Sequence, residues 1–256
     1  MTFVHDLNPV LFNLGFLEVR YYGLAYFIGF IFAYFFIKKY CKDFNLNLDP
    51  DDVSNLLIIV IISSITIARL FYAIVYNFNF FITNPWQIFM IWKGGLSIHG
   101  GIIGACIGMF IFSRWKKVHF LDLTDIGTIP ITFGLILSRI ANFINSELYG
   151  KITNLPWGVK FKDVEGFRHP SQLYESFKNA IILGILIFFK NKPFPRGFMT
   201  SIFLILYAVF RFVVEFFRAP DPQLGYIILG FSMGHILSII MFFIGISLLY
   251  YIFRKR

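Results

Sequence analysis

The sequence is poor in charged residues. Asp, Glu, Lys and Arg make up 14% of its 256 residues, whereas a soluble domain usually contains roughly 25%. Hydrophobic residues make up 57%. This composition excludes a disordered chain, because too much apolar surface is present to stay solvated. It also argues against an ordinary soluble globule, since the few charged side chains cannot cover that surface. The composition therefore predicts a protein whose solvent is lipid.

Cysteine is also scarce. The two cysteines, Cys41 and Cys106, are far apart and do not form a CxxC pair. This excludes a disulfide framework and a zinc finger. His and carboxylate residues do not recur at metal-ligand spacing, so we expect neither a metal nor another cofactor.

Long apolar runs dominate what is present. A transmembrane helix needs about 20 mostly apolar residues. Seven segments qualify or nearly qualify, at residues 22–37, 53–76, 96–112, 123–144, 177–189, 198–217 and 226–253. We therefore predict an all-α integral membrane protein with seven transmembrane helices, folded as one polytopic domain over residues 1–256.

Basic residues alternate along the connecting segments. Lys and Arg are denser after the first, third, fifth and seventh segments than on the opposite side. The dense groups are Lys38, Lys39, Lys42; Arg114, Lys116, Lys117; Lys190, Lys192, Arg196; and Arg254, Lys255, Arg256. The positive-inside rule then predicts an outer N-terminus and a cytoplasmic C-terminus. The net charge of +9 is explained in this way without a nucleic-acid partner.

One connection is unusually long. Residues 145–175 form a predicted outer loop of about 30 residues, a length that is uncommon unless the loop has a function. We expect it to provide substrate access.

Six ionisable residues interrupt the apolar runs. An Arg at the centre of a bilayer costs roughly 2.5–3.5 kcal/mol on insertion scales, so such residues usually pair or face a water-filled cavity. These residues are Arg69, His99, Arg139, Glu147, Arg211 and Glu215.

Arg211 and Glu215 are four residues apart and share a helix face with Tyr207 and Arg218. They form either a structural ion pair or a site in which Glu215 orients Arg211 toward an anionic substrate.

Arg139, Asn142 and Asn145 also follow helical spacing, with Glu147 and Gly150 just beyond. Polar groups at this density in a membrane helix are costly unless they bind something, although a role in helix packing stays open.

His99 lies among glycines that include Gly100 and Gly101. These glycines favour close helix packing or the approach of a phosphate to backbone N–H groups. Arg69 is either a phosphate ligand or a hydrogen-bonding residue of the bundle.

Several sequence blocks resemble one family. Residues 138–147, SRIANFINSE, and then Gly150 resemble the G-R-x-x-N-F-x-N-x-E-x-x-G signature of bacterial prolipoprotein diacylglyceryl transferases, with Ser138 in place of the first Gly. Similar blocks occur in the same order at 19–24, 98–101, 168–175, 207–218, 223–225 and 232–235, the last with His235 where the family carries Gln.

The resemblance implies seven transmembrane helices with the N-terminus outside, in the bacterial inner (cytoplasmic) membrane. It also implies an activity. Such enzymes move a diacylglyceryl group from phosphatidylglycerol to the lipobox cysteine in the signal peptide of a preprolipoprotein. A thioether forms and glycerol-1-phosphate leaves, which is the first step of lipoprotein maturation. The expected partners are therefore phosphatidylglycerol, lipobox signal peptides and membrane lipid.

This chemistry assigns roles to the ionisable residues. The substrate supplies the thiol, so we expect Cys41 and Cys106 to take no part. Arg139 and Arg211 would hold the phosphate, because Arg suits bidentate phosphate contact. The other expected roles are headgroup binding by Tyr22, Asn142 and Asn145; orientation of the arginines by Glu147 and Glu215; general base catalysis by His99; and further substrate contacts from Gly150, Tyr207, Arg218, Arg69, Gly100 and Gly101.

Three other classes fit less well. A transporter would share the buried charges, but the sequence lacks the inverted repeat of common transporter folds. An intramembrane protease needs a G-x-S-x-G-like serine with a histidine, or paired aspartates in helices. A metal-dependent headgroup synthase needs clustered aspartates. Neither pattern is present.

Overall fold

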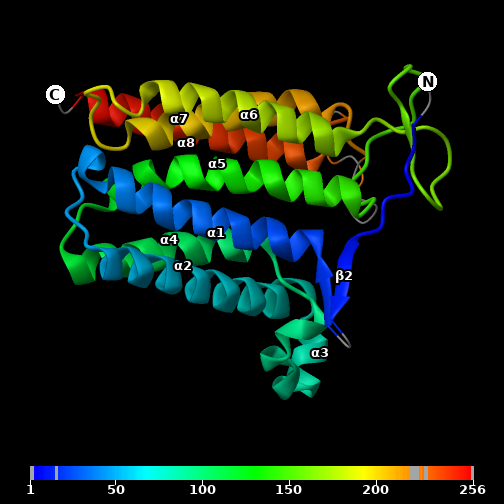
Figure 1. Ribbon diagram of the computed structural model, residues 1–256, viewed down its shortest axis with the longest axis horizontal. Coiled ribbons are helices and arrows are strands. Elements are labelled where there is room, and N and C mark those ends of the chain that lie inside the picture. The colour runs from blue at the N-terminus through cyan, green and yellow to red at the C-terminus, as the bar shows by residue number, and fades with distance from the viewer. Residues whose placement is uncertain (1–2, 15–16, 220–224, 226, 228–229, 255–256) are drawn as a thin grey trace. The chain divides into compact units, whose positions relative to one another are not determined.

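The computed structural model describes residues 3–14, 17–219, 225, 227 and 230–254. Within these residues, seven helices are long and apolar enough to cross a membrane, as predicted. They are α1 (Tyr21–Tyr40), α2 (Pro50–Phe71), α4 (Ile98–Lys116), α5 (Phe120–Ile144), α6 (Ser171–Phe189), α7 (Phe198–Glu215) and α8 (Met233–Arg254). Figure 1 labels these helices.

The chain forms two compact units. Unit 1 contains residues 1–36 and 125–256, and unit 2 contains residues 37–124. Helices α1 and α5 each begin in one unit and end in the other. The predicted single domain and the predicted orientation of the termini stay predictions.

Unit 1 is built on α5, α6, α7 and α8, with the first part of α1. Helices α6, α7 and α8 run side by side (Figure 1). Phe32 of α1 packs on Phe133 of α5, with ring centroids 4.3 Å apart. The Asp125 carboxylate in α5 accepts hydrogen bonds from the Gly197 and Thr200 N–H groups at 2.7 and 2.8 Å. The Asp125 carboxylate therefore accepts from backbone N–H groups in the first turn of α7 that have no partner within the helix, and its negative charge is favourable at a helix N-terminus.

Two small sheets stand beside the helices of unit 1. Strand β1 (Phe3–Val4) pairs in parallel with β4 (Val159–Lys160), and β2 (Val10–Leu14) pairs antiparallel with β3 (Leu17–Arg20). Strand β4 lies within the long loop, so the N-terminal residues help to order that loop.

Unit 2 depends on close packing of α2 against α4. Three glycines spaced by four residues, Gly100, Gly104 and Gly108, are buried on one face of α4. A Cβ atom at Gly104 would overlap the Ser63 carbonyl oxygen and would lie 2.7 Å from Ser64 Cα. Small residues at such spacing let membrane helices approach each other closely. A π-helix (Tyr72–Tyr76), the short helix α3 (Phe78–Thr83) and two 3₁₀ helices (Pro85–Phe89 and Ile91–Lys93) lead from α2 to α4.

Two predicted boundaries are wrong. Helix α6 begins at Ser171, six residues before the predicted start, so the loop ends earlier than residue 175. The predicted seventh helix began at Tyr226, which lies outside the described residues, as do Gln223, Leu224, Lys255 and Arg256. Helix α8 begins at Met233, because Gly230 has a φ of +78° and a turn joins the Ile227 N–H group to the Phe231 carbonyl.

The close approach at Gly104 makes a testable prediction. We expect Gly104→Ala to lower the melting temperature of the detergent-solubilised protein, because the added methyl group meets backbone atoms of α2. The matched control is Gly184→Ala in α6, where a Cβ meets nothing within 4 Å. A change of similar size in both variants would contradict the packing role of Gly104.

Candidate functional site

A buried carboxylate is the centre of the polar cluster in unit 1. Glu175, in the second turn of α6, is 2% exposed. Its Oε1 atom accepts a hydrogen bond from Arg211 of α7. Its Oε2 atom lies 3.3 Å from Lys178 Nζ and 3.9 Å from Arg139 Nε of α5. Three helices therefore bring cations to one carboxylate.

A second carboxylate continues the cluster at the end of α7. Glu215 Oε2 lies 2.7 Å from Arg211 Nη2 and 3.8 Å from Arg218 Nη1. Arg211 and Glu215 therefore pair on α7 as their spacing predicted, whereas Arg218 lies beyond the end of this helix. The Ser232 hydroxyl donates to Glu215 Oε1 at 2.6 Å. The Ser232 hydroxyl also lies 3.1 Å from His235 Nδ1. His235 is therefore linked to Glu215 through Ser232.

The end of α5 forms the third part. Arg139 donates to Asn142 Oδ1 at 3.4 Å, and the amides of Asn142 and Asn145 each donate to Glu147 at 3.3 Å. Glu147 therefore reaches Arg139 through Asn142 rather than by direct contact. The Nε atom of Arg139 is buried and has no hydrogen-bond partner among the described residues.

Gly150 joins the long loop to the end of α7. Its N–H donates to the His169 carbonyl at 2.8 Å, and its backbone forms a β-bridge with Arg218. A Cβ atom here would lie 2.5 Å from the Phe217 carbonyl oxygen. Only glycine allows this close approach, which keeps the loop beside Arg218.

The two tyrosines predicted for the site both lie in unit 1. The ring of Tyr207 lies under Lys178, with Nζ 3.6 Å from the ring centroid. Tyr22, in the first turn of α1, has its hydroxyl 3.3 Å from that of Tyr26.

His99, Gly100 and Gly101 belong to unit 2, at the start of α4. His99 is exposed, and Ser97 caps this helix by accepting the Gly100 N–H at 3.4 Å. Gly100 packs against α2, since a Cβ atom would lie 2.6 Å from Phe71 Cβ, whereas Gly101 has more space.

Arg69 anchors the connection between α2 and α4. Its guanidinium donates to the carbonyls of Gln87, Ile88, Met90, Gly94 and Gly95, and its carbon lies 4.9 Å from the Phe81 ring centroid. Of the two alternatives for Arg69, this geometry favours a structural role in unit 2 over a phosphate contact.

Sequence reasoning missed Glu175 and Lys178. Both are buried in α6, where they neighbour the predicted Arg139 and Arg211. A signal was available, because the predicted segment 177–189 contains one lysine, and a charge inside an apolar segment is the criterion that identified the other residues. Gln172 was also missed; its amide donates to the Glu147 carbonyl at 2.5 Å.

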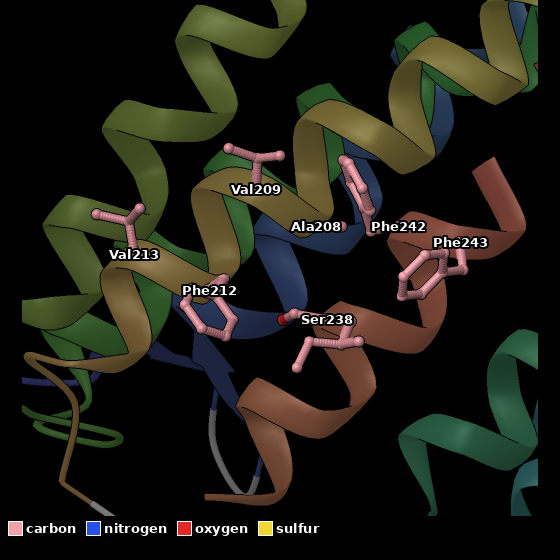
Figure 2. Close-up of a pocket in the computed structure, with 8 residues that line it drawn as sticks. Ala208, Val209, Phe212, Val213, Ser238, Phe242 and Phe243 are labelled. Atoms are coloured by element: carbon pink, nitrogen blue, oxygen red, sulfur yellow. The ribbon is translucent and has the colours of Figure 1, made fainter. Parts of the chain in front are cut away.

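An apolar groove lies between α7 and α8. Its volume is 430 Å³. Figure 2 shows Phe212 of α7 and Ser238 of α8 among the residues that line it. The Ser238 hydroxyl donates to the Gly234 carbonyl of its own helix, so it does not make the groove polar. Phe212 and Arg211 both belong to α7, so the groove and the polar cluster share this helix.

Known proteins resemble this chain over its whole length. The family model described as prolipoprotein diacylglyceryl transferase matches residues 9–251. A phosphatidylglycerol–prolipoprotein diacylglyceryl transferase of Geobacter sulfurreducens is 41% identical, with 100% of this chain and 99% of the relative aligned. Proteins of the same name are 40% identical in Ehrlichia ruminantium strain Welgevonden, over 95% and 96%, and 39% identical in Coxiella burnetii strain RSA 331, over 100% and 99%.

His169 makes the end of the long loop sensitive to pH. Burial and the nearby Lys151 lower the pKa of His169 below its ordinary value, and its Nδ1 atom lies 3.1 Å from the Tyr174 hydroxyl. The unfolded chain therefore binds a proton more readily at this residue than the folded chain does. This contribution to stability is fully present above the unfolded pKa of about 6.5 and is lost as the pH falls toward the lower folded pKa.

We therefore expect the melting temperature to fall more steeply between pH 7.5 and pH 5.5 in the parent protein than in His169→Gln. Parallel pH dependences in the two proteins would contradict this assignment.

Proposed function

The chain belongs to the prolipoprotein diacylglyceryl transferase family, and we propose that its polar cluster on α5, α6 and α7 is where a diacylglyceryl group passes from phosphatidylglycerol to a prolipoprotein. The chain is a multi-pass membrane transferase of lipoprotein biosynthesis. We infer further that it acts in the bacterial inner membrane, that the acceptor is the lipobox cysteine, and that nucleic acid is not a partner.

One observation carries the placement of the site. Arg139 of α5 and Arg211 of α7 are brought to one carboxylate, Glu175, whose Oε1 atom accepts a hydrogen bond from Arg211 and whose Oε2 atom lies 3.9 Å from Arg139 Nε. Two guanidinium groups placed in this way suit an anion, because Arg binds phosphate oxygens through its parallel N–H donors. The phosphodiester of phosphatidylglycerol is such an anion.

The arginines have the donors that a phosphate needs. A guanidinium has five N–H donors. Arg139 uses Nη1 for Asn142, and its Nε lacks a hydrogen-bond partner among the described residues. Arg211 is held by Glu175 and Glu215, which orient its planar fork. We propose that Arg139 and Arg211 bind the phosphate oxygens and stabilise the charge that develops on them.

The reaction exchanges one bond to carbon. The cysteine sulfur attacks the diacylglyceryl carbon that carries the phosphate ester, so a C–S bond forms as the C–O bond breaks. The electron pair of that C–O bond stays on glycerol-1-phosphate, and the thiol proton passes to a base. The thiolate is the reactive form, and a free thiol has a pKa of about 8.5. A general base whose pKa lies near the working pH therefore assists the attack.

The other contacts follow from the geometry. We propose that Asn142, Asn145 and Tyr22 bind the glycerol headgroup or phosphate, with Glu147 fixing both amides. Tyr207, Arg218 and Gly150 complete the border of the site. The loop would admit the signal peptide, and the groove between α7 and α8 would receive an acyl chain, because the groove is apolar and is lined in part by α7, the helix that carries Arg211.

His99 is proposed as the base on chemical grounds. Its imidazole is exposed on the first turn of α4, and His is the side chain that most often serves as a general base. Gly101 would keep the backbone beside it open to substrate, whereas Gly100 is occupied by its packing against α2. Arg69 is not part of this proposal, because backbone carbonyls occupy its donors.

The proposed function is tested with purified protein, phosphatidylglycerol and a lipobox peptide. We expect a thioether-linked product with the cysteine peptide and essentially none with its Cys→Ser counterpart. Absence of product from both peptides would contradict the proposed reaction.

The phosphate assignment predicts that Arg139→Ala and Arg211→Ala each lower kcat/KM by at least about 10³-fold, the scale on which loss of a transition-state charge contact acts. Both proteins must first be shown to fold in detergent. Phe177→Met is the matched control, because Phe177 is 70% exposed on α6. Parent-like activity in either arginine variant would overturn the assignment.

The base assignment predicts a changed pH–rate profile. We expect His99→Gln to lower kcat/KM by about 10²–10⁴-fold and to change the pH dependence of kcat/KM, because the glutamine side chain cannot take the thiol proton. A variant with the rate and pH dependence of the parent would exclude His99 as the base.

A further inference from the structure

Lys178 is a buried lysine that the proposed mechanism does not use. It lies in α6, only 2% exposed, within a helix long enough to span the membrane. Its Nζ atom is 3.3 Å from Glu175 Oε2, 3.1 Å from Asn179 Oδ1 and 3.6 Å from the centroid of the Tyr207 ring. A carboxylate, an amide oxygen and an aromatic face all attract a cation, so these three contacts favour the charged ammonium form of Lys178.

The position of Lys178 bears on Arg139. Both side chains approach the same oxygen of Glu175, but Lys178 Nζ is nearer, at 3.3 Å against 3.9 Å for Arg139 Nε. The other oxygen of Glu175 is occupied by Arg211. The attraction between Glu175 and Arg139 is therefore shared with a closer cation, and Arg139 Nε makes no hydrogen bond to a described residue.

Removal of the Lys178 charge would change this balance. Glu175 would then have only the two arginines as counter-ions, and its Oε2 atom would have Arg139 alone. Coulomb attraction grows as screening by a competing cation is lost. Arg139 would move from its 3.9 Å separation into a full ion pair, and its Nε donor would be taken by the protein.

We propose that Lys178 is a positioning residue for the phosphate site. It acts as the counter-ion of Glu175 and so keeps the Arg139 guanidinium available to the phosphate of the lipid. Lys178 is too buried to touch the substrate itself. This inference rests on the proposed function, because it takes Arg139 to be a phosphate ligand.

A purely structural lysine would behave differently. It would hold α6 to α7 through Glu175 and Tyr207, and its loss would lower stability and the amount of active enzyme. The affinity of the remaining active molecules for lipid would not change. The proposal instead predicts a specific change in KM for phosphatidylglycerol, with a smaller change in kcat.

The test is a double-mutant cycle in the peptide transfer assay, with phosphatidylglycerol varied in mixed micelles. We expect Lys178→Met to raise KM for phosphatidylglycerol by about tenfold and to change kcat by less than about threefold. Lys178→Arg, which keeps the charge, should stay close to the parent. Phe177→Met, on the exposed face of the same helix, is the matched control.

The second mutation of the cycle is Glu175→Gln. With no charge at residue 175, nothing draws Arg139 inward and the lysine is no longer needed. We therefore expect Lys178→Met to have little effect on KM in the Glu175→Gln background, so that the two changes are strongly non-additive. This result would not follow from independent structural roles.

Two results would overturn the proposal: an unchanged KM in Lys178→Met, or an equal rise in KM with and without the Glu175 charge. If Lys178→Met does not fold, Lys178→Gln takes its place in the cycle. Failure of the parent protein to modify the peptide would instead overturn the proposed function, so the two failures are distinguishable.

Discussion

The compensation of one buried carboxylate organises the polar part of this membrane protein. Glu175 lies in a membrane-length helix, and its charge is met by Arg139 from α5, Lys178 from its own helix and Arg211 from α7. Removing one partner of a buried pair typically costs about 3–5 kcal/mol, because the other charge is left uncompensated. The need to compensate the Glu175 charge therefore fixes the positions of the three helices. This need is greater in lipid than in water, because lipid does not solvate an unpaired charge.

The same requirement links stability to chemistry. Glu175 draws Arg139 and Arg211 to one place, and these are the two residues to which we assign the phosphate of the lipid. Glu215, which accepts a hydrogen bond from Ser232, holds Arg211 from the other side, so the protein itself pre-orients the Arg211 guanidinium. Such pre-orientation is what makes fixed charges effective in catalysis.

The sequence predicted the parts of this arrangement that depend on local spacing. The seven spans follow from apolar run length, and the Arg211–Glu215 contact follows from the four-residue period of a helix. Glu175 was not predicted as a site residue. The sequence prediction assigns it to the long loop, because the predicted helix begins six residues after the true start of α6. Its cations come from helices distant in sequence, and spacing within one helix carries no information about that convergence.

Glu147 lies in the long loop just after the end of α5, and contacts from other parts of the chain hold it there. Ser146 and Leu148 on either side of Glu147 both have a φ near +57°, at 57° and 56°. This conformation costs a non-glycine residue of order 1–3 kcal/mol and persists only where the surroundings impose it. Three contacts do so: His5 Nδ1 lies 3.0 Å from the Ser146 hydroxyl, the Gln172 amide donates to the Glu147 carbonyl, and the Ser171 hydroxyl donates to the Leu148 carbonyl at 2.9 Å. The N-terminal strand and the start of α6 thus hold the Glu147 carboxylate against Asn142, and through it help to set the position of Arg139.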